Sequence, residues 1–535
     1  MNYRHYLPAS LILASSLAGT GLWGSEREQL QADTVIDIGV RRELFLDDYL
    51  VEKLVGRLER RLHHPVPQEI SLTFNEEWEG NASGGYCSVF KDDRLYRMYY
   101  TAYQMEGGDT GEMGKGGPVH PLYTCYAESD DGIHWRKPEL GLHEFRGSKK
   151  NNIVLVTEVD GEYRINAGHV AVFKDENPDA PADARYKAFV RSDTLKKRPL
   201  PTGLLAYKSP DGLNWSRMSE KPVINFGAFD SQNLGFWDSV HSVYRAYWRY
   251  DTAGITNENI WEPAGVRAIR TATSRDFVNW STPVNLSYSN SPEEHLYTNQ
   301  IKPYPRAPHL LIGFPTRYID RGWSNSMRGL PDPADRRERS VTNERFGTAL
   351  TEGLIMSSRD GVAFHRWNEA FLRPGPERPG TWTYGDHYLA WHVLETKSSF
   401  RGGPNELSLY ATEDYWLGTS CTLRRYTLRL DGFVSAHAPF DGGELVTKPV
   451  RFLGQQLSLN ISTSAAGSVR VEIQDLQGKA LPGYSLEDCP PHFGDSVDRI
   501  VEWTSGAKVS SVAGQAVRLR FEVKDGDLFS FQFQQ

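Results

Sequence analysis

The sequence predicts an all-β protein, a five-bladed β-propeller followed by a C-terminal β-sandwich. Three observations support this prediction: a turn motif that recurs along the chain, paired strand-like segments that precede its copies, and long alternating segments near the C-terminus. Apolar residues show almost no helical periodicity. The chain has 535 residues, 39% hydrophobic, 12% aromatic and 24% charged, which is enough for two or three globular domains.

The N-terminal segment, 1–25, is expected to be a secretory signal peptide. Arg4 and His5 precede an apolar stretch that is too short to span a bilayer, and Ser16 and Ala18 give a small-residue cleavage pattern. No later segment approaches about 18 apolar residues, so we expect no membrane span. We therefore expect a periplasmic or secreted protein; the alternative is the frayed apolar N-terminus of a cytoplasmic one.

A turn motif of Ser, Asp, Gly and an aromatic residue recurs through 36–435. Its copies lie at 129–135, 209–215, 274–280 and 358–364, with a degenerate fifth at 412–416. The aspartate can hydrogen-bond to its own backbone and the glycine tolerates positive φ, so each copy predicts a tight turn. We therefore assign a structural role to the aspartates, which are Asp131, Asp211, Asp276, Asp360 and Asp414.

Pairs of strand-like segments precede the turns. They lie at 86–100, 169–175 with 185–190, 234–248, 301–314, and 388–394 with 407–411. One hairpin followed by another gives a four-stranded antiparallel blade, and five blades close a propeller over 36–435. Insertions at 104–119 and 319–346 interrupt this pattern, and because long loops are commonly functional we interpret them as rims of a binding funnel.

The last part of the chain, 436–535, has a different character. Apolar and polar residues alternate through 467–475 and 517–533, between turn residues. This alternation is typical of half-buried strands and predicts a separate β-sandwich. Four cysteines are too few for a disulfide scaffold; Cys87 and Cys125 either pair or are small buried hydrophobes.

This layout resembles glycoside hydrolase family 32 and, more loosely, family 43. The stretches that carry the resemblance are Leu-Phe-Leu-Asp-Asp-Tyr-Leu near the N-terminus, 227–233, 296–300, 306–309 and 423–435. The resemblance implies a propeller glycosidase. The Asn-Asp-Pro, Arg-Asp-Pro and Glu-Cys motifs of family 32 do not occur, so cleavage of sucrose or fructans is not carried over. The turns also resemble those of sialidases, but an arginine triad with a Tyr–Glu pair cannot be assembled.

Glycoside hydrolysis needs one carboxyl group to protonate the leaving oxygen and another as nucleophile or base. In a propeller the innermost strands start at one end of the channel, so polar residues at those starts converge. The catalytic candidates are Asp230, Glu294, Glu79 and Asp386. The substrate-binding candidates are Asn81, Asn166, His169, Asn233, His295, Asn299, Arg317, Trp382 and His387.

Asp230 is the strongest candidate, because it lies between apolar strands with no evident need for a turn; an Asx turn is the alternative. Glu294 and Glu79 are candidate general acids, since burial near another carboxylate raises a pKa. Asp386 is a candidate base or hydroxyl ligand. Each candidate also has a structural interpretation in a local hydrogen bond or salt bridge.

Arginines and aromatic residues near these strand starts add detail. Arg249 and Arg317 would suit an acidic or sulfated sugar, and Trp382 and Tyr384 a stacking platform, with salt bridges and core packing as the structural alternatives. Asp47 and Asp48 fit either a catalytic or a solvated edge position.

The resulting hypothesis is an exo-acting glycoside hydrolase that uses carboxylate catalysis on a glycan or oligosaccharide, without a cofactor or metal. The net charge of −8 argues against nucleic acid as the main partner. A non-catalytic glycan-binding propeller is the alternative, and a lyase with a His or Tyr base is a third reading. The sequence fixes neither the sugar nor the oligomeric state.

Overall fold

The computed structural model describes residues 35–105, 119–194, 202–257, 260–289 and 291–535. The predicted signal peptide and most of the insertion at 104–119 lie outside these residues. The described chain is built mainly of strands, which confirms the all-β prediction. None of its helices is long and apolar enough to cross a membrane.

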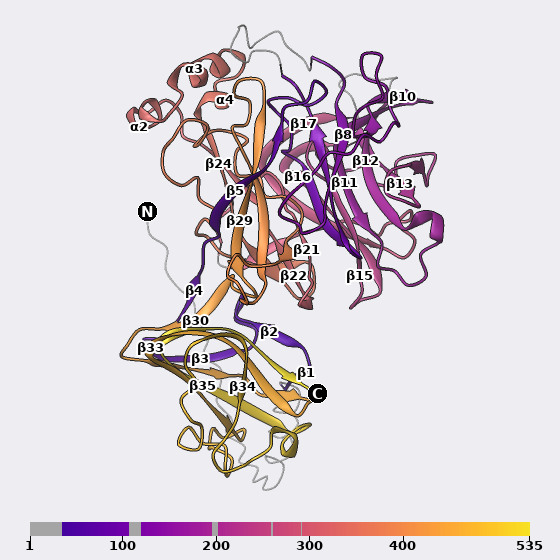
Figure 1. Ribbon diagram of the computed structural model, residues 1–535. Helices are drawn as coiled ribbons and strands as arrows, with labels where there is room; N and C mark the ends of the chain where they lie inside the picture. Colours follow the sequence, from indigo (N-terminus) through magenta and orange to yellow (C-terminus); the bar gives the residue numbers. More distant parts are fainter. Residues whose placement is uncertain (1–34, 106–118, 195–201, 258–259, 290) are drawn as a thin grey trace, which may run out of the picture.

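Three antiparallel sheets follow one another in chain order (Figure 1). Sheet 1 contains β6 (Cys87–Asp92), β7 (Leu95–Ala102), β8 (Tyr123–Ser129) and β9 (Ile153–Val156). Sheet 2 contains β10 (Glu158–Asp160), β11 (Tyr163–Lys174), β12 (Tyr186–Thr194), β13 (Thr202–Ser209) and β14 (Ser216–Arg217). Sheet 3 contains β15 (Leu234–Asp238), β16 (Val243–Thr256), β17 (Trp261–Ser274) and β18 (Val284–Asn285).

Two further groups of strands complete this part of the chain. Sheet 4 orders β19 (Ser287–Ser289), β26 (Ala363–Arg366), β25 (Met356–Ser358), β22 (Ala307–Gly313) and β21 (Lys302–Tyr304), beside a small sheet of β20 (His295–Leu296), β23 (Thr316–Asp320) and β24 (Ala349–Gly353). Sheet 5 orders β27 (Leu394–Thr396), β28 (Glu406–Glu413), β29 (Cys421–Arg429) and β5 (Val66–Phe74). The strand predicted at 388–394 is therefore regular only from Leu394.

Neighbouring sheets contact one another in order. β11 contacts β6 and β7, β15 contacts β11 and β12, and β20 contacts β17. The indole N–H of Trp391, just before β27, donates to the Ile301 carbonyl of sheet 4 at 2.8 Å, and β27 contacts β6 of sheet 1. The early strand β5 pairs with β29, so strands from the two ends of this region share sheet 5.

The four full copies of the turn motif have the predicted structural role. In the second copy, Asp211 Oδ1 accepts backbone N–H bonds from Leu213 and Asn214, both at 2.8 Å, and Ser209 Oγ accepts the N–H of Gly212 at 2.8 Å. The same bonds recur around Asp131, Asp276 and Asp360. Gly212 has a φ of 81°, which a residue with a side chain rarely adopts.

The C-terminal unit is one ten-stranded sheet assembly that includes the first strands of the chain. It contains β30 (Val434–Ala438), β31 (Gly443–Thr447), β32 (Val450–Phe452), β33 (Gln456–Gln474), β34 (Asp495–Val501) and β35 (Ala516–Gln534). It also contains β1 (Ile36–Gly39), β2 (Arg42–Leu44), β3 (Val51–Gly56) and β4 (Glu59–Leu62). Figure 1 shows these indigo strands among the yellow ones.

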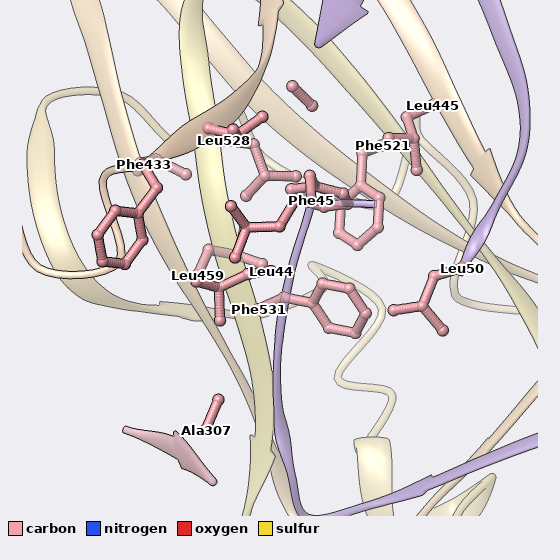
Figure 2. Packing of buried hydrophobic residues seen from close by; sticks show 14 of the residues in the cluster. Leu44, Phe45, Leu50, Ala307, Phe433, Leu445, Leu459, Phe521, Leu528 and Phe531 are labelled. Atoms are coloured by element: carbon pink, nitrogen blue, oxygen red, sulfur yellow. The ribbon is translucent and has the colours of Figure 1, made fainter. Parts of the chain in front are cut away.

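This pairing differs from the expected domain boundary at residue 36. Leu44, Phe45 and Leu50 lie among Phe521 and Phe531 of β35, and all five are buried (Figure 2). A sequence pattern shows that a short segment is apolar but not which sheet buries it, so the assignment of 36–62 needed the tertiary structure.

The adjacent acidic pair is held by arginines. Asp47 bonds to Arg359 at 3.0 Å and Asp48 to Arg60 at 2.6 Å. Both aspartates therefore have structural partners.

The insertion at 319–346 is helical rather than an irregular loop. It forms α2 (Asn325–Gly329), α3 (Pro333–Thr342) and α4 (Arg345–Thr348); two short 3₁₀ turns, η1 (Ala182–Ala184) and η2 (Val509–Ser511), lie elsewhere. Ser324 caps α2, and Pro333 occupies the first turn of α3, where its missing N–H costs nothing. The capping serine and the proline are signals for the start of a helix, and they can be read in the sequence although the segment is polar.

A continuous apolar core joins the C-terminal unit to sheets 4 and 5. The Phe433 ring lies 5.4 Å from Tyr304 and 6.2 Å from Phe314, between centroids. Beside it, fully buried Asp431 accepts bonds from Arg306 and from the Tyr304 hydroxyl, both at 2.8 Å. Elsewhere the four cysteines are free and buried, which fits their interpretation as small hydrophobes.

Candidate functional site

Side chains beside sheets 1, 2, 3 and 5 and beside the small sheet of β20, β23 and β24 meet in one cluster. Tyr86 precedes β6, His169 lies on β11, Asp230 precedes β15, Tyr297 follows β20 and Tyr388 precedes β27. Ring centroids of Tyr86 lie 5.2 Å from His169 and 6.4 Å from Tyr388, and those of Tyr297 and Tyr388 lie 5.5 Å apart. The Tyr86 hydroxyl donates to the backbone carbonyl of Asp230 at 3.3 Å.

Two more tyrosines extend this group, and we call Tyr86, Tyr297, Tyr318, Tyr384 and Tyr388 the tyrosine cluster. The hydroxyls of Tyr297 and Tyr384 share a hydrogen bond of 2.9 Å, and Tyr318 packs edge-on against Tyr384. Burial raises the pKa of Tyr384 and Tyr388 well above that of free tyrosine, so both hydroxyls stay protonated and can donate hydrogen bonds.

Asp230 is an ionised, accessible carboxylate in this cluster. It forms an ion pair with Arg249; its side chain is 39% exposed, whereas that of Arg249 is 5% exposed. Burial opposes ionisation, but the charges of Arg249 and Arg191 hold the pKa of Asp230 at about 2. The Arg249 guanidinium also lies 4.8 Å from the Tyr297 ring centre, which fixes its orientation.

Asp251 is a second carboxyl group of this site, and the sequence reasoning missed it. It follows Arg249 by two positions on β16, so the two side chains share a face of the strand. Burial raises the pKa of Asp251, the charge of Asp230 raises it further, and Arg249 and Arg267 only partly offset this. The period-two spacing of Arg249 and Asp251 was the sequence signal that could have identified it.

The pKa values of these two carboxyl groups are therefore moved in opposite directions. Asp230 is stabilised as the anion, whereas Asp251 is stabilised in its protonated form. Carboxyl pairs whose surroundings separate their pKa values in this way commonly divide the roles of acid and base.

The predicted residues Asn166, His169 and His295 also belong to this region. Asn166 Oδ1 accepts a bond from His169 Nδ1 at 3.0 Å, and burial together with Arg191 lowers the pKa of His169 to about 3. His295 Nδ1 accepts the backbone N–H of Arg267 at 3.1 Å. Burial and Arg267 lower the pKa of His295, so both imidazoles are neutral near pH 7.

The other predicted carboxylates have different partners from Asp230. Glu79 accepts the Tyr100 hydroxyl at 2.5 Å and the Lys137 ammonium at 2.6 Å, and its side chain is fully buried. Glu294 lies between Arg366 at 3.0 Å and Arg317 at 3.3 Å. Both carboxylates therefore have cationic partners close by, and these contacts give no support to the prediction that they are general acids.

Asp386 lies behind the tyrosine cluster. Its Oδ1 accepts the Tyr415 N–H at 2.9 Å, while Oδ2 has no hydrogen-bond partner among the described residues. Burial raises its pKa well above the ordinary value, and Asp414 and Glu413 add to this. The side chain is completely buried, so the predicted role as a base or hydroxyl ligand has no geometric support.

The remaining predicted binding residues form bonds with other residues of the protein. Asn81 accepts the backbone N–H of Met105 and donates to the Gly418 carbonyl, and Asn233 donates to the carbonyls of Phe229 and Ser231. Asn299 accepts the backbone N–H of Ile301, and Arg317 pairs with Glu352. The Trp382 indole donates to the Gly375 carbonyl, and the backbone N–H of His387 donates to the Thr412 carbonyl. Burial lowers the pKa of His387 to about 4, so it is neutral at pH 7. These groups shape the loops around the tyrosine cluster.

The helical insertion supports the same loops. Arg336 donates to the Trp382 carbonyl at 2.6 Å, and Arg339 donates to Thr383 Oγ1 at 2.8 Å and to the Tyr415 carbonyl at 2.7 Å. Both arginines are buried, so α3 holds the segment just before Tyr384 and the loop at Tyr415.

The described residues contain no group of three or more His, Cys, Asp or Glu side chains able to hold a metal ion. A cavity of about 890 Å³ is lined by Lys91, Lys302 and Glu395, among others. It lies at the end of β6 opposite Tyr86, away from the tyrosine cluster.

Comparison with known proteins gives structural neighbours only. Neither the family models nor the curated proteins contain a match. An N-acetylgalactosamine deacetylase from F. plautii, solved with blood group B trisaccharide, has a TM-score of 0.41 and 12% identity over 70% of this chain and 96% of its own.

The neighbours also include two fructofuranosidases. The enzyme from Schwanniomyces occidentalis, complexed with fructosylnystose, has a TM-score of 0.37 and 12% identity over 86% of this chain and 96% of its own. The glycoside hydrolase family 32 β-fructofuranosidase of Bombyx mori has a TM-score of 0.38 and 9% identity over 89% of this chain and 94% of its own. Similarity at this level does not bear on the chemistry, which has to be argued from the side chains.

Proposed function

We propose that the protein is a glycoside hydrolase whose catalytic carboxyl groups are Asp230 and Asp251. The observation that carries this proposal is the opposite displacement of their pKa values around Arg249. Hydrolysis of a glycosidic bond needs one protonated and one ionised carboxyl group at the same time. The tyrosine cluster would then provide flat faces and hydroxyl donors for a sugar ring.

We assign the scaffold to a closed five-bladed propeller at 66–429 with a β-sandwich formed by 36–62 and 434–534. Contacts between successive sheets, and the pairing of β5 with β29, support ring closure. In this arrangement the ends of the inner strands meet at the axis, where the tyrosine cluster, His169 and Asp230 lie together.

In the proposed mechanism Asp251 donates its proton to the leaving glycosidic oxygen as the bond to the anomeric carbon breaks. Asp230 either attacks that carbon or takes a proton from the attacking water. Arg249 keeps Asp230 ionised, and its stacking on Tyr297 restricts the direction in which the carboxylate points. The carboxyl pair therefore depends on one arginine for both charge and position.

We further propose that the enzyme is exported. We also propose that it removes sugars from the ends of chains. Phe346 of α4 stacks on Tyr384 with centroids 5.6 Å apart, so the helical insertion covers one side of the tyrosine cluster. A site bounded in this way favours a terminal sugar. Mid-chain products as the first products of polysaccharide cleavage would contradict exo action.

The test is hydrolysis of a broad glycan panel by the purified protein and by D230N, D251N and D48N. We expect D230N and D251N to lower kcat/KM by about 10²- to 10⁴-fold, the usual contribution of a positioned acid or base. D48N is the matched control, because Asp48 pairs with Arg60 and is 67% exposed. Glycans that bind without being cleaved by the wild type would instead establish the binding-module alternative.

A further inference from the structure

Four arginines surround the tyrosine cluster, and two of them lack a carboxylate partner. Arg249 pairs with Asp230, and Arg191 pairs with Asp193 at 3.0 Å. Within the described chain, Arg267 and Arg345 have no Asp or Glu oxygen at ion-pair distance. Two guanidinium groups of the region are therefore free of ion pairs to carboxylates within the described residues.

Aromatic rings hold these two guanidinium groups in place. Arg267 lies 5.3 Å from the ring centre of Tyr297 and 5.1 Å from that of Tyr318. Arg345 lies 4.7 Å from Phe346 and 5.8 Å from Tyr384. Stacking occupies the faces of a guanidinium and leaves its N–H edge for a carboxylate or sulfate, which that edge fits well.

The N–H groups of both arginines are incompletely used. Arg345 Nη1 is buried without a hydrogen-bond partner in the described structure. Arg267 Nη1 has only a long contact of 3.4 Å to His295 Nδ1. A buried N–H group of a charged side chain that lacks an acceptor lowers the stability of the protein. An anion that accepted these N–H groups would therefore be bound by charge-assisted hydrogen bonds.

The neighbouring groups favour an external anion. Asp251 lies opposite Arg267 in the β16–β17 pairing, but no ion pair joins the two within the described structure, and burial raises the pKa of Asp251. His295 is neutral and accepts a bond from the Arg267 backbone, which orients that residue without adding charge. Both Arg267 and Arg345 are partly exposed.

We infer that the substrate carries a negative charge, a uronate carboxylate or a sulfate ester, bound between Arg267 and Arg345 beside the reacting sugar. This inference rests on the proposed function, because it names the substrate class of the same site. It also makes a separate claim about binding. Binding can be measured whether or not cleavage occurs.

The experiment measures calorimetric binding of trigalacturonate, its methyl ester, a sulfated galactan trimer and the matching neutral trimer. We expect at least one anionic probe to bind about 10- to 100-fold more tightly than its neutral counterpart, the range for a hydrogen bond to a charged group. The difference should shrink as ionic strength rises. Preference for the uronate or for the sulfated trimer distinguishes the two sources of charge.

Variants connect the preference to the named residues. R267Q and R345Q should each remove most of the advantage of the anionic probe, while R57Q, whose exposed side chain pairs with Asp441 in the C-terminal unit, should retain it. Equal binding of charged and neutral probes, or no binding of any anionic probe, overturns the inference. Charge-dependent binding without cleavage contradicts only the hydrolase; cleavage of neutral glycans alone contradicts only the anion site.

Discussion

At the residue scale, the surroundings of each aspartate determine what it does. Asp230 is held ionised by Arg249, Asp251 is held toward its protonated form, and Asp386 is buried with an unpaired oxygen. Asp211 is locked into a turn. The side chain is the same in all four places, so only the neighbouring charges and the burial assign the roles.

The pH dependence of activity follows from this pair. In the proposed mechanism Asp251 must be protonated, so kcat/KM should fall as pH rises through its raised pKa, whereas Asp230 should lose its charge only near pH 2. Because Arg267 lowers the pKa of Asp251, R267Q should move the alkaline limb to higher pH. The measurement is a pH profile of kcat/KM beside R57Q; an unmoved limb would remove Asp251 from the role of acid.

Asp386 gives a stability prediction with the opposite sign to an ordinary ion-paired carboxylate. Its folded pKa is raised, so the folded state loses stability as pH rises above the unfolded value of 3.8 toward the folded one. D386N cannot ionise and therefore removes that loss, so at pH 7 it should be more stable than the wild type. Below pH 3.8 the gain should disappear.

Thermal unfolding of D386N and wild type at two pH values checks this prediction. Full activity in a stabilised D386N would establish a structural role. A stable variant without activity would restore Asp386 to the catalytic group.

At the element scale, turns that depend on neighbouring residues could be predicted from the sequence, whereas contacts between distant strands could not. The turn around Asp211 needs only neighbouring residues, so its motif predicted it correctly. The site around Asp230 was predicted in part, because strand starts in successive sheets converge. Its partner Asp251 lies inside β16, and only the pairing with β17 and the burial by neighbouring sheets give that residue a raised pKa.

Two other differences between the sequence-based predictions and the structure have the same origin. The segment 36–62 was apolar in sequence, but its partners lie in 434–534. Glu79 was a candidate general acid, but Lys137, 58 residues further along the chain, forms an ion pair with it. Partners that lie far apart in the sequence cannot be predicted from a local pattern, whereas capping and turn signals involve neighbouring residues and can be.

The turn prediction can be tested at Asp211. D211A removes the acceptor of two backbone N–H groups and should lower the free energy of unfolding by about 1–2 kcal/mol, the range for a lost capping bond. The pKa of Asp211 is lowered to about 2, so its stabilising effect is present at neutral pH and is lost as pH falls from about 4 to about 2. D211N keeps the acceptor and should restore most of the stability in chemical denaturation.

At the scale of the whole molecule, the two units share one core and an ionic network. Phe433 packs against Tyr304 and Phe314, and buried Asp431 bonds to Arg306 from sheet 4 and to Arg42 from the N-terminal strands. Since β1 to β4 also lie in the C-terminal sheet, the chain enters that unit, leaves it to form the five sheets, and returns. We therefore expect the two units to unfold together.

The buried free cysteines allow this cooperativity to be measured. Cys489 lies in the C-terminal unit and Cys125 in sheet 1, and both thiols are protected by burial. Thiol labelling across a denaturant series, read peptide by peptide, should give the same midpoint for both residues. F433A should lower both midpoints together, because deleting a buried phenylalanine costs about 3–5 kcal/mol. If Cys489 became reactive at a lower denaturant concentration than Cys125 in the wild type, the shared core would not couple the units, and the pairing of the N-terminal strands would stabilise the C-terminal unit alone.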